Sequence, residues 1–194
     1  MLIVGLGNPE GKYFHTWHNL GFLCVDVLAE RLGAKMKKKG NQLFGLVPPV
    51  NGVELLLLKP LTYMNRSGEA VLAVMRKYKL GVEDVIVFVD DLYIDKGNVR
   101  LVQGGSNAGH NGIRSINNLV GDNKYVKVRV GCKPEKPPHS MANYVLSRFP
   151  EDELPTVREG VHKAVDAVQM LVDGIALREV QQQFNATNKQ EGEE

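Results

Sequence analysis

Short apolar runs alternate along the chain with segments in which apolar residues recur every three or four positions. Runs at residues 2–6, 43–47, 53–58, 85–89, 98–102 and 125–130 predict β-strands. Helical spacing predicts helices at residues 20–32, 67–80, 112–119, 150–171 and 175–184. The run VIVFV at residues 85–89 has no polar position, which is typical of a central strand covered on both faces. Alternating strands and helices predict an α/β fold, a single globular domain with a mixed β-sheet flanked by helices.

Residues with strong local preferences predict how these elements begin and end. Gly33 closes the first helix, and the turn-forming sequence PPVNG at residues 48–52 joins two strands. Ser67 is a candidate N-cap of the second helix. The basic segment 35–40 is interpreted as a solvated loop. No repeat or linker interrupts this order.

Length and charge narrow the class of protein. A chain of 194 residues fits one domain, placed at residues 1–185, with a disordered acidic tail at 186–194. The net charge is +2, and the segment from Thr187 carries one lysine and three glutamates, so the rest carries +4. This excess is a weak indication of an anionic partner.

The sequence argues against a membrane or secreted protein. Its longest apolar runs are far shorter than the roughly 18 residues of a membrane span. The N-terminal segment MLIVGLGNPE lacks the basic start of a signal peptide. Two cysteines, Cys24 and Cys132, are too few for a disulfide scaffold and are not spaced as zinc ligands. We therefore expect a cytoplasmic protein without a metal.

Polar turns follow three of the predicted strands. The carboxyl ends of strands in an open α/β sheet meet at one edge, where sites collect. The candidates for such a site are Asn8, His18, Asn65, Asp90, Asp91, His110 and Asn111. Each also has a purely structural interpretation, since asparagine is common in turns and His18 precedes a helix that it could cap.

Several motif-based alternatives fail on spacing. Gly5-x-Gly7 begins a dinucleotide-binding pattern, but Glu10 stands where the third glycine is needed. The segment GGSNA at residues 104–108 misses the nucleophile-elbow pattern by one residue. A zinc site is disfavoured because the chain has no H-E-x-x-H motif. Phosphate binding by the glycine-rich loop 104–112, ahead of a helix, remains open.

Four blocks of sequence together resemble the bacterial-type peptidyl-tRNA hydrolase family. They are GLGNPEGKYFHTWHNLGF (residues 5–22), KPLTYMNRSGEAV (59–71), VDDLYIDKGNVRL (89–101) and GGSNAGHNGIRSI (104–116). The resemblance extends to about residue 185. It implies a twisted mixed sheet and hydrolysis of the ester between a peptide and tRNA, which recycles tRNA from stalled or abandoned translation. It implies a monomer that needs neither cofactor nor metal.

The resemblance also assigns roles to residues. His18 is implied as the general base that activates water, with Asp90 orienting its imidazole. The implied substrate-binding residues are Asn8, Tyr13, Asn65, His110 and Asn111. A basic patch for the phosphate backbone of tRNA is expected from Arg100, Arg114, Lys127 and Arg129, of which Arg129 is favoured. The chemistry is self-consistent, because neutral histidine at cytoplasmic pH can accept a proton and an ester needs no covalent nucleophile.

Two positions depart from the family pattern. Trp17 stands where the family usually has arginine, and Tyr93 stands where it often has an acidic residue. Two alternatives are kept beside the hydrolase. An RNA-binding protein on the same scaffold predicts binding without catalysis, and a nucleotide-dependent oxidoreductase predicts cofactor binding.

Overall fold

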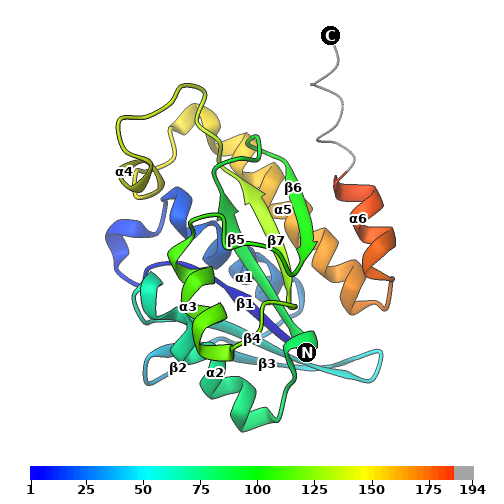
Figure 1. Cartoon of the computed structure of the whole chain (residues 1–194). Coiled ribbons are helices and arrows are strands. Elements are labelled where there is room, and N and C mark those ends of the chain that lie inside the picture. The colour runs from blue at the N-terminus through cyan, green and yellow to red at the C-terminus, as the bar shows by residue number, and fades with distance from the viewer. Residues whose placement is uncertain (186–194) are drawn as a thin grey trace.

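A seven-stranded mixed sheet organises the molecule, in the strand order β2-β3-β4-β1-β5-β7-β6 (Figure 1). The computed structural model describes residues 1–185, so the predicted acidic tail lies outside the described residues. The four strands β4, β1, β5 and β7 are parallel to one another. The pairs β2–β3, β3–β4 and β6–β7 are antiparallel. The strands are β1 (Leu2–Gly5), β2 (Lys37–Lys39), β3 (Gln42–Val50), β4 (Val53–Pro60), β5 (Val85–Asp91), β6 (Val99–Gln103) and β7 (Val126–Gly131).

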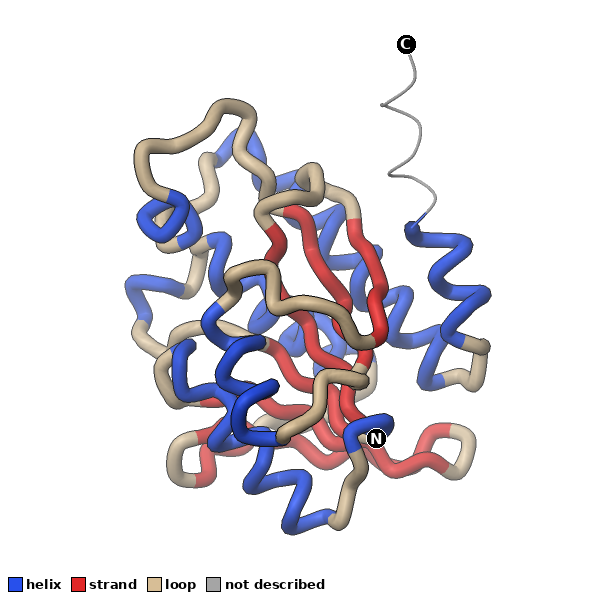
Figure 2. Tube along the Cα trace, in the orientation of Figure 1, coloured by secondary structure: helices blue, strands red, loops and turns tan. Residues whose placement is uncertain are grey.

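Helices cover both faces of the sheet, as Figure 2 shows. One apolar cluster packs α1 (Leu20–Arg31), α5 (Leu154–Val172) and α6 (Leu177–Asn185) on one face. A second cluster packs α2 (Ser67–Tyr78) and α3 (Asn111–Val120) on the other. The remaining helices are short: η1 (Gly11–Tyr13), η2 (Trp17–Asn19), η3 (Met64–Arg66), η4 (Val82–Asp84), α4 (Met141–Val145) and η5 (Glu151–Glu153). The predicted α/β fold with a mixed sheet is confirmed.

Strand β5 is the central strand that its apolar sequence predicts. Ile86 and Phe88 belong to the cluster under α1 and α5, and Val87 belongs to the cluster under α2 and α3. Every residue of the strand is buried, including the two aspartates at its end. A carboxylate at that position is therefore held at the carboxyl end of a central strand and away from bulk water.

Three local predictions are wrong. Residues 37–39 form the edge strand β2 rather than a loop, although their lysine side chains are exposed as expected. Strand β3 continues through Pro48 and Pro49, because a bulge between Val47 and Val50 absorbs two residues that cannot donate to the ladder. Ser67 is not the N-cap of α2, because its hydroxyl donates to the Met64 carbonyl oxygen, 2.9 Å away.

The start of α1 lies directly on the backbone of the sheet. A Cβ atom on Gly21 would lie 2.4 Å from the Leu6 nitrogen and 2.5 Å from the Phe88 oxygen. Only glycine permits this approach, because a Cβ atom on any other residue would overlap these backbone atoms. The contact brings the preceding turn, with His18, to the carboxyl end of β5.

Candidate active site

The carboxyl ends of the parallel strands surround a cavity of about 520 Å³. Asn8 follows β1, Asn65 follows β4, and Asp90 lies at the end of β5. All three line the cavity, together with His18 from η2 and His110 from the start of α3. The structure therefore brings together the side chains that the sequence placed after separate strands.

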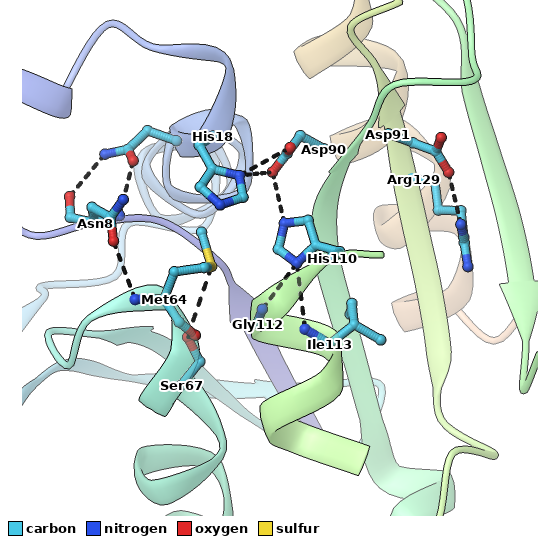
Figure 3. A network of polar contacts seen from close by, with 11 residues as sticks. Asn8, His18, Met64, Ser67, Asp90, Asp91, His110, Gly112, Ile113 and Arg129 are labelled. Carbon is cyan, nitrogen blue, oxygen red and sulfur yellow. Dashed lines mark hydrogen bonds and ion pairs between the residues drawn. The ribbon is translucent and has the colours of Figure 1, made fainter. Parts of the chain in front are cut away.

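His18 and Asp90 form a buried pair. Nδ1 of His18 lies 3.1 Å from each carboxylate oxygen of Asp90 (Figure 3). Burial disfavours the imidazolium, but the charge and hydrogen bonding of Asp90 outweigh it and raise the pKa of His18. Burial also opposes ionisation of Asp90, yet His18 and His110 hold the pKa of its carboxyl well below the usual range. Because a carboxylate only accepts, Nδ1 of His18 is the donor and Nε2 keeps its lone pair.

His110 is the second partner of Asp90. Its Nε2 lies 3.0 Å from Oδ1 of Asp90. Its Nδ1 accepts hydrogen bonds from the backbone N–H groups of Gly112, at 3.1 Å, and Ile113, at 3.3 Å (Figure 3). Both ring nitrogens are used within the protein and only 8% of the side chain is exposed. The substrate contact that the resemblance implies for His110 stays a prediction, and the residue is one of those that line the cavity. The same bonds occupy two amides that a phosphate at this helix start would need.

Asn8 presents a single polar group to the cavity. Its backbone N–H donates to Oδ1 of Asn19 and its carbonyl accepts from Nδ2 of Asn19, at 2.8 and 3.0 Å. Its own Oδ1 accepts the N–H of Met64 at 3.1 Å. The carboxamide nitrogen of Asn8 is left as a donor toward the cavity it lines. Asn19 was not singled out from the sequence, because a buried asparagine that fixes a turn has no distinguishing sequence signal.

The rim of the cavity agrees only in part with the sequence. Asn65 and Asn111 are exposed and line the cavity as expected. Tyr13 is not among the lining residues, and the two tyrosines found there are Tyr63, in the segment before η3, and Tyr93. Tyr93, one of the two departures from the family pattern, is 74% exposed at the same rim.

Helix α4 forms a wall of the cavity that the sequence did not predict. Met141, Val145 and Leu146 line it, and five helical residues are too few for a periodic signal. Trp17, the second departure, lies behind this wall and is 1% exposed. Its ring stacks on Tyr144 of α4 with centroids 5.7 Å apart. Trp17 therefore supports the wall from the core and does not line the cavity.

Two of the four residues predicted to contact tRNA bond to other parts of the protein. Lys127 is fully buried, and its ammonium donates to the carbonyl oxygens of Gly104 and Asn123 at 2.6 and 3.3 Å. Burial, together with the charge of Arg129, lowers the pKa of Lys127 to about 8.

Arg129 is the other of these two residues. It pairs with Asp91 at 2.7 Å and donates to the Ser106 carbonyl at 2.9 Å, with 12% of its side chain exposed. Both side chains point to the same face of β7, because they are two residues apart, and both hold the loop 104–110 from below. The contact of both residues with tRNA phosphates stays a prediction, and these bonds show that both side chains are also used within the protein.

The other two basic residues have exposed side chains that can contact a polyanion. Arg100 on β6 and Arg114 on α3 are both exposed. Arg100 and Arg129 are register partners across β6 and β7, so Arg100 emerges on the same face of the sheet as the loop 104–110.

His18, Asp90 and His110 are also the one group of potential metal ligands found in the described part of the chain, with their ligand atoms within 4.8 Å of one another. The two imidazole nitrogens lie at hydrogen-bond distance from the carboxylate, and N–H donation explains both contacts.

Within residues 1–185, no helix is both long and apolar enough to cross a membrane.

Known proteins resemble this chain over nearly its whole length. The family model described as peptidyl-tRNA hydrolase matches residues 2–192. The peptidyl-tRNA hydrolase of Bacillus thuringiensis subsp. konkukian is 44% identical over 169 residues, which cover 87% of this chain and 90% of that protein. The peptidyl-tRNA hydrolase of Geobacillus thermodenitrificans is 43% identical over 172 residues, which cover 88% of this chain and 92% of that protein. The crystal structure of the peptidyl-tRNA hydrolase from Acinetobacter baumannii superposes with a TM-score of 0.87 at 34% identity, covering 95% and 94% of the two chains.

Proposed function

The chain belongs to the peptidyl-tRNA hydrolase family and hydrolyses peptidyl-tRNA, and we propose that His18 is the general base of this reaction. The observation that carries the proposal is the bond from Nδ1 of His18 to the buried carboxylate of Asp90, which leaves Nε2 as the acceptor. Asp90 fixes the tautomer and stabilises the imidazolium that forms when a proton is taken up.

The proposed reaction needs water and no covalent intermediate with the enzyme. Nε2 of His18 takes a proton from water as its oxygen bonds to the carbonyl carbon of the ester. The tetrahedral intermediate then breaks its bond to the ribose oxygen of tRNA. The imidazolium returns the proton to that oxygen, so the products are a peptide carboxylic acid and free tRNA.

Asn8 is the proposed donor to the negative oxygen of the tetrahedral intermediate. Its Oδ1 is occupied by the Met64 N–H, so the carboxamide is fixed with its NH₂ group toward the cavity. A donor held in place before the reaction stabilises the developing charge, and losing one such donor costs roughly 10²–10³ in rate. Asn65 and Asn111, at the rim, are proposed to bind the peptide amide and the acceptor end of tRNA.

Selection for peptides follows from the neutral lining around these asparagines. An amide is satisfied by carboxamide donors and acceptors, whereas the charged amine of an aminoacyl-tRNA would lose its hydration on entry. We propose that Arg114 and Arg100 hold the phosphate backbone of tRNA, since they are the predicted basic residues that remain exposed. We further propose a cytoplasmic monomer that acts without a metal.

Release of labelled peptide from an N-blocked aminoacyl-tRNA tests the role of His18. We expect His18→Ala to lower kcat by about 10²–10⁴-fold, because a positioned base contributes that much. The matched control is His15→Ala, an exposed histidine three residues earlier, which should stay close to wild type.

A chelator and a binding assay complete the experiment. Wild-type turnover should be unchanged in the chelator, and a loss would point to a metal on His18, Asp90 and His110. Full activity of His18→Ala would refute the assignment of the base. Binding of tRNA by the wild type without peptide release would favour the RNA-binding alternative.

A further inference from the structure

His110 is the one histidine of the cavity whose two nitrogens are both committed to the protein. Nδ1 faces two backbone N–H groups at the start of α3, and Nε2 faces the Asp90 carboxylate. Backbone amides can only donate, so Nδ1 must carry a lone pair. Nε2 must then carry the proton, which the carboxylate accepts. The two histidines on Asp90 are therefore opposite tautomers, with Nδ1–H on His18 and Nε2–H on His110.

The cap also fixes which nitrogen of the His110 ring is the acceptor. A proton on Nδ1 would point at the N–H groups of Gly112 and Ile113, removing their acceptor at the positive end of the α3 dipole. The first turn of α3 also packs closely on the ring, because a Cβ atom on Gly112 would lie 3.1 Å from Cε1 of His110. Asp90 thus has one partner that takes up a proton during the proposed reaction and one that remains its donor.

We propose that His110 is a positioning residue for the proposed His18 base: a donor, held by the first turn of α3, that orients Asp90 and shares its carboxylate with His18. The inference rests on the proposed role of His18. A carboxylate that faced His18 alone would hold its imidazolium too firmly, and a larger share of the enzyme would be protonated at neutral pH. Sharing the carboxylate between two donors keeps the base available while its orientation is retained.

The surroundings contain few other groups that could produce a pH effect. Asp91, the next residue on β5, is paired with Arg129 of β7. The thiol of Cys132, after β7, stays neutral because burial, with Asp90 and Asp91 nearby, raises its pKa well above the usual value. Lys96 acts on this thiol in the opposite sense, and it is paired with Glu153.

Two substitutions separate the two contacts of His110. In His110→Asn, Oδ1 takes the place of Nδ1, so the cap of α3 is kept and the donor to Asp90 is lost. In His110→Gln, Nε2 of the amide takes the place of the ring Nε2, so the donor is kept and the cap is weakened. The readouts are kcat and KM for peptide release as functions of pH, with Tm as a measure of folding.

We expect His110→Asn to move the acidic limb of kcat/KM to higher pH by roughly half a unit or more, because Asp90 then acts on His18 alone. Its kcat should fall with little change in KM. His110→Gln should keep the limb at its wild-type pH, at a lower Tm. The inference is overturned if the limb of His110→Asn coincides with wild type, or if both variants move it equally.

A measurement on the unmodified protein decides the matter if either variant does not fold. Long-range ¹H–¹⁵N spectra of the histidines report which nitrogen carries the proton. We expect Nδ1–H for His18 and Nε2–H for His110. A proton on Nδ1 of His110 overturns the inference even when His18→Ala is inactive. An active His18→Ala variant instead removes the proposed base and leaves the tautomer of His110 as measured.

Discussion

Replacing Asp90 by asparagine tests the arrangement of the site with one oxygen changed to NH₂. The carboxylate accepts from two imidazole N–H groups, at 3.1 Å from His18 and 3.0 Å from His110. An amide can accept on one side only. Because α3 holds His110 as a donor, the amide oxygen should take the Oδ1 position, 3.0 Å from Nε2 of His110, and the NH₂ group the Oδ2 position, 3.1 Å from Nδ1 of His18. An NH₂ group there favours the tautomer in which Nδ1 of His18 accepts, which moves its proton to Nε2 and removes the base.

The size of the effect follows from this change of tautomer. The equivalent change in Ser-His-Asp triads lowers kcat by about 10⁴-fold. Water can restore part of the correct tautomer here, since His18 borders an open cavity. We therefore expect Asp90→Asn to lower kcat by about 10³–10⁴-fold, which corresponds to about 4–5.5 kcal/mol in the activation free energy. KM should change little, because Asp90 is 5% exposed and its carboxylate oxygens face the two histidines.

Single-turnover release of labelled peptide measures the loss, and Asp91→Asn is the matched control. Asp91 is the neighbouring residue, is also buried, and contacts Arg129 and the backbone N–H of Tyr93 instead of a histidine. Its substitution should lower Tm but keep kcat within about tenfold of wild type. The reasoning is refuted if Asp90→Asn keeps kcat within tenfold, or if Asp91→Asn loses as much.

Two further results are expected. The raised pKa of His18 places the acidic limb of kcat/KM above its ordinary value of 6.5, with activity rising toward higher pH, and a midpoint at or below 6.5 in the measured profile would contradict the pairing with Asp90. Lys127→Met should leave two carbonyl groups without their donor and lower the free energy of unfolding by about 1–3 kcal/mol, with tRNA affinity unchanged, whereas Arg114→Met should weaken tRNA binding and leave stability unchanged. Denaturant titration and a filter-binding assay separate these two variants. Weaker tRNA binding by Lys127→Met at unchanged stability would support Lys127 as a tRNA contact.

The central sheet was predictable from sequence because burial on both faces leaves a simple record. Strand β5 is apolar at every position before Asp90, so the run identifies both a central strand and a carboxylate at its end. Strand β2 leaves no such record, since its three lysines are exposed and bury no apolar side chain. It exists because β3 supplies partners for its backbone, and lysine also blunts the free edge against other chains.

The bonds that Lys127 and Arg129 make within the protein have one physical cause. The resemblance implies both residues as tRNA contacts, and nothing in the sequence of β7 indicates these bonds. The loop 104–110, however, turns carbonyl groups of Gly104 and Ser106 toward the sheet, and these need donors. Long side chains on β7 supply them, so the face of the sheet under this loop carries charge in place of an apolar core. The sequence of β7 does not show this requirement, because the carbonyl groups that need donors belong to the loop 104–110.

The same distinction explains how far the site itself was predictable. The resemblance to the family implies the pairing of His18 with Asp90, whereas strand ends by themselves indicate only that Asp90 lies at the carboxyl end of the sheet. The residue type of His110 allows either a substrate contact or a cap. What decides is the direction of two amide groups in the first turn of α3, 3.1 and 3.3 Å from Nδ1. A protonation state set by backbone N–H groups has no counterpart in side-chain identity, so it can be inferred only once the helix has been placed against the sheet.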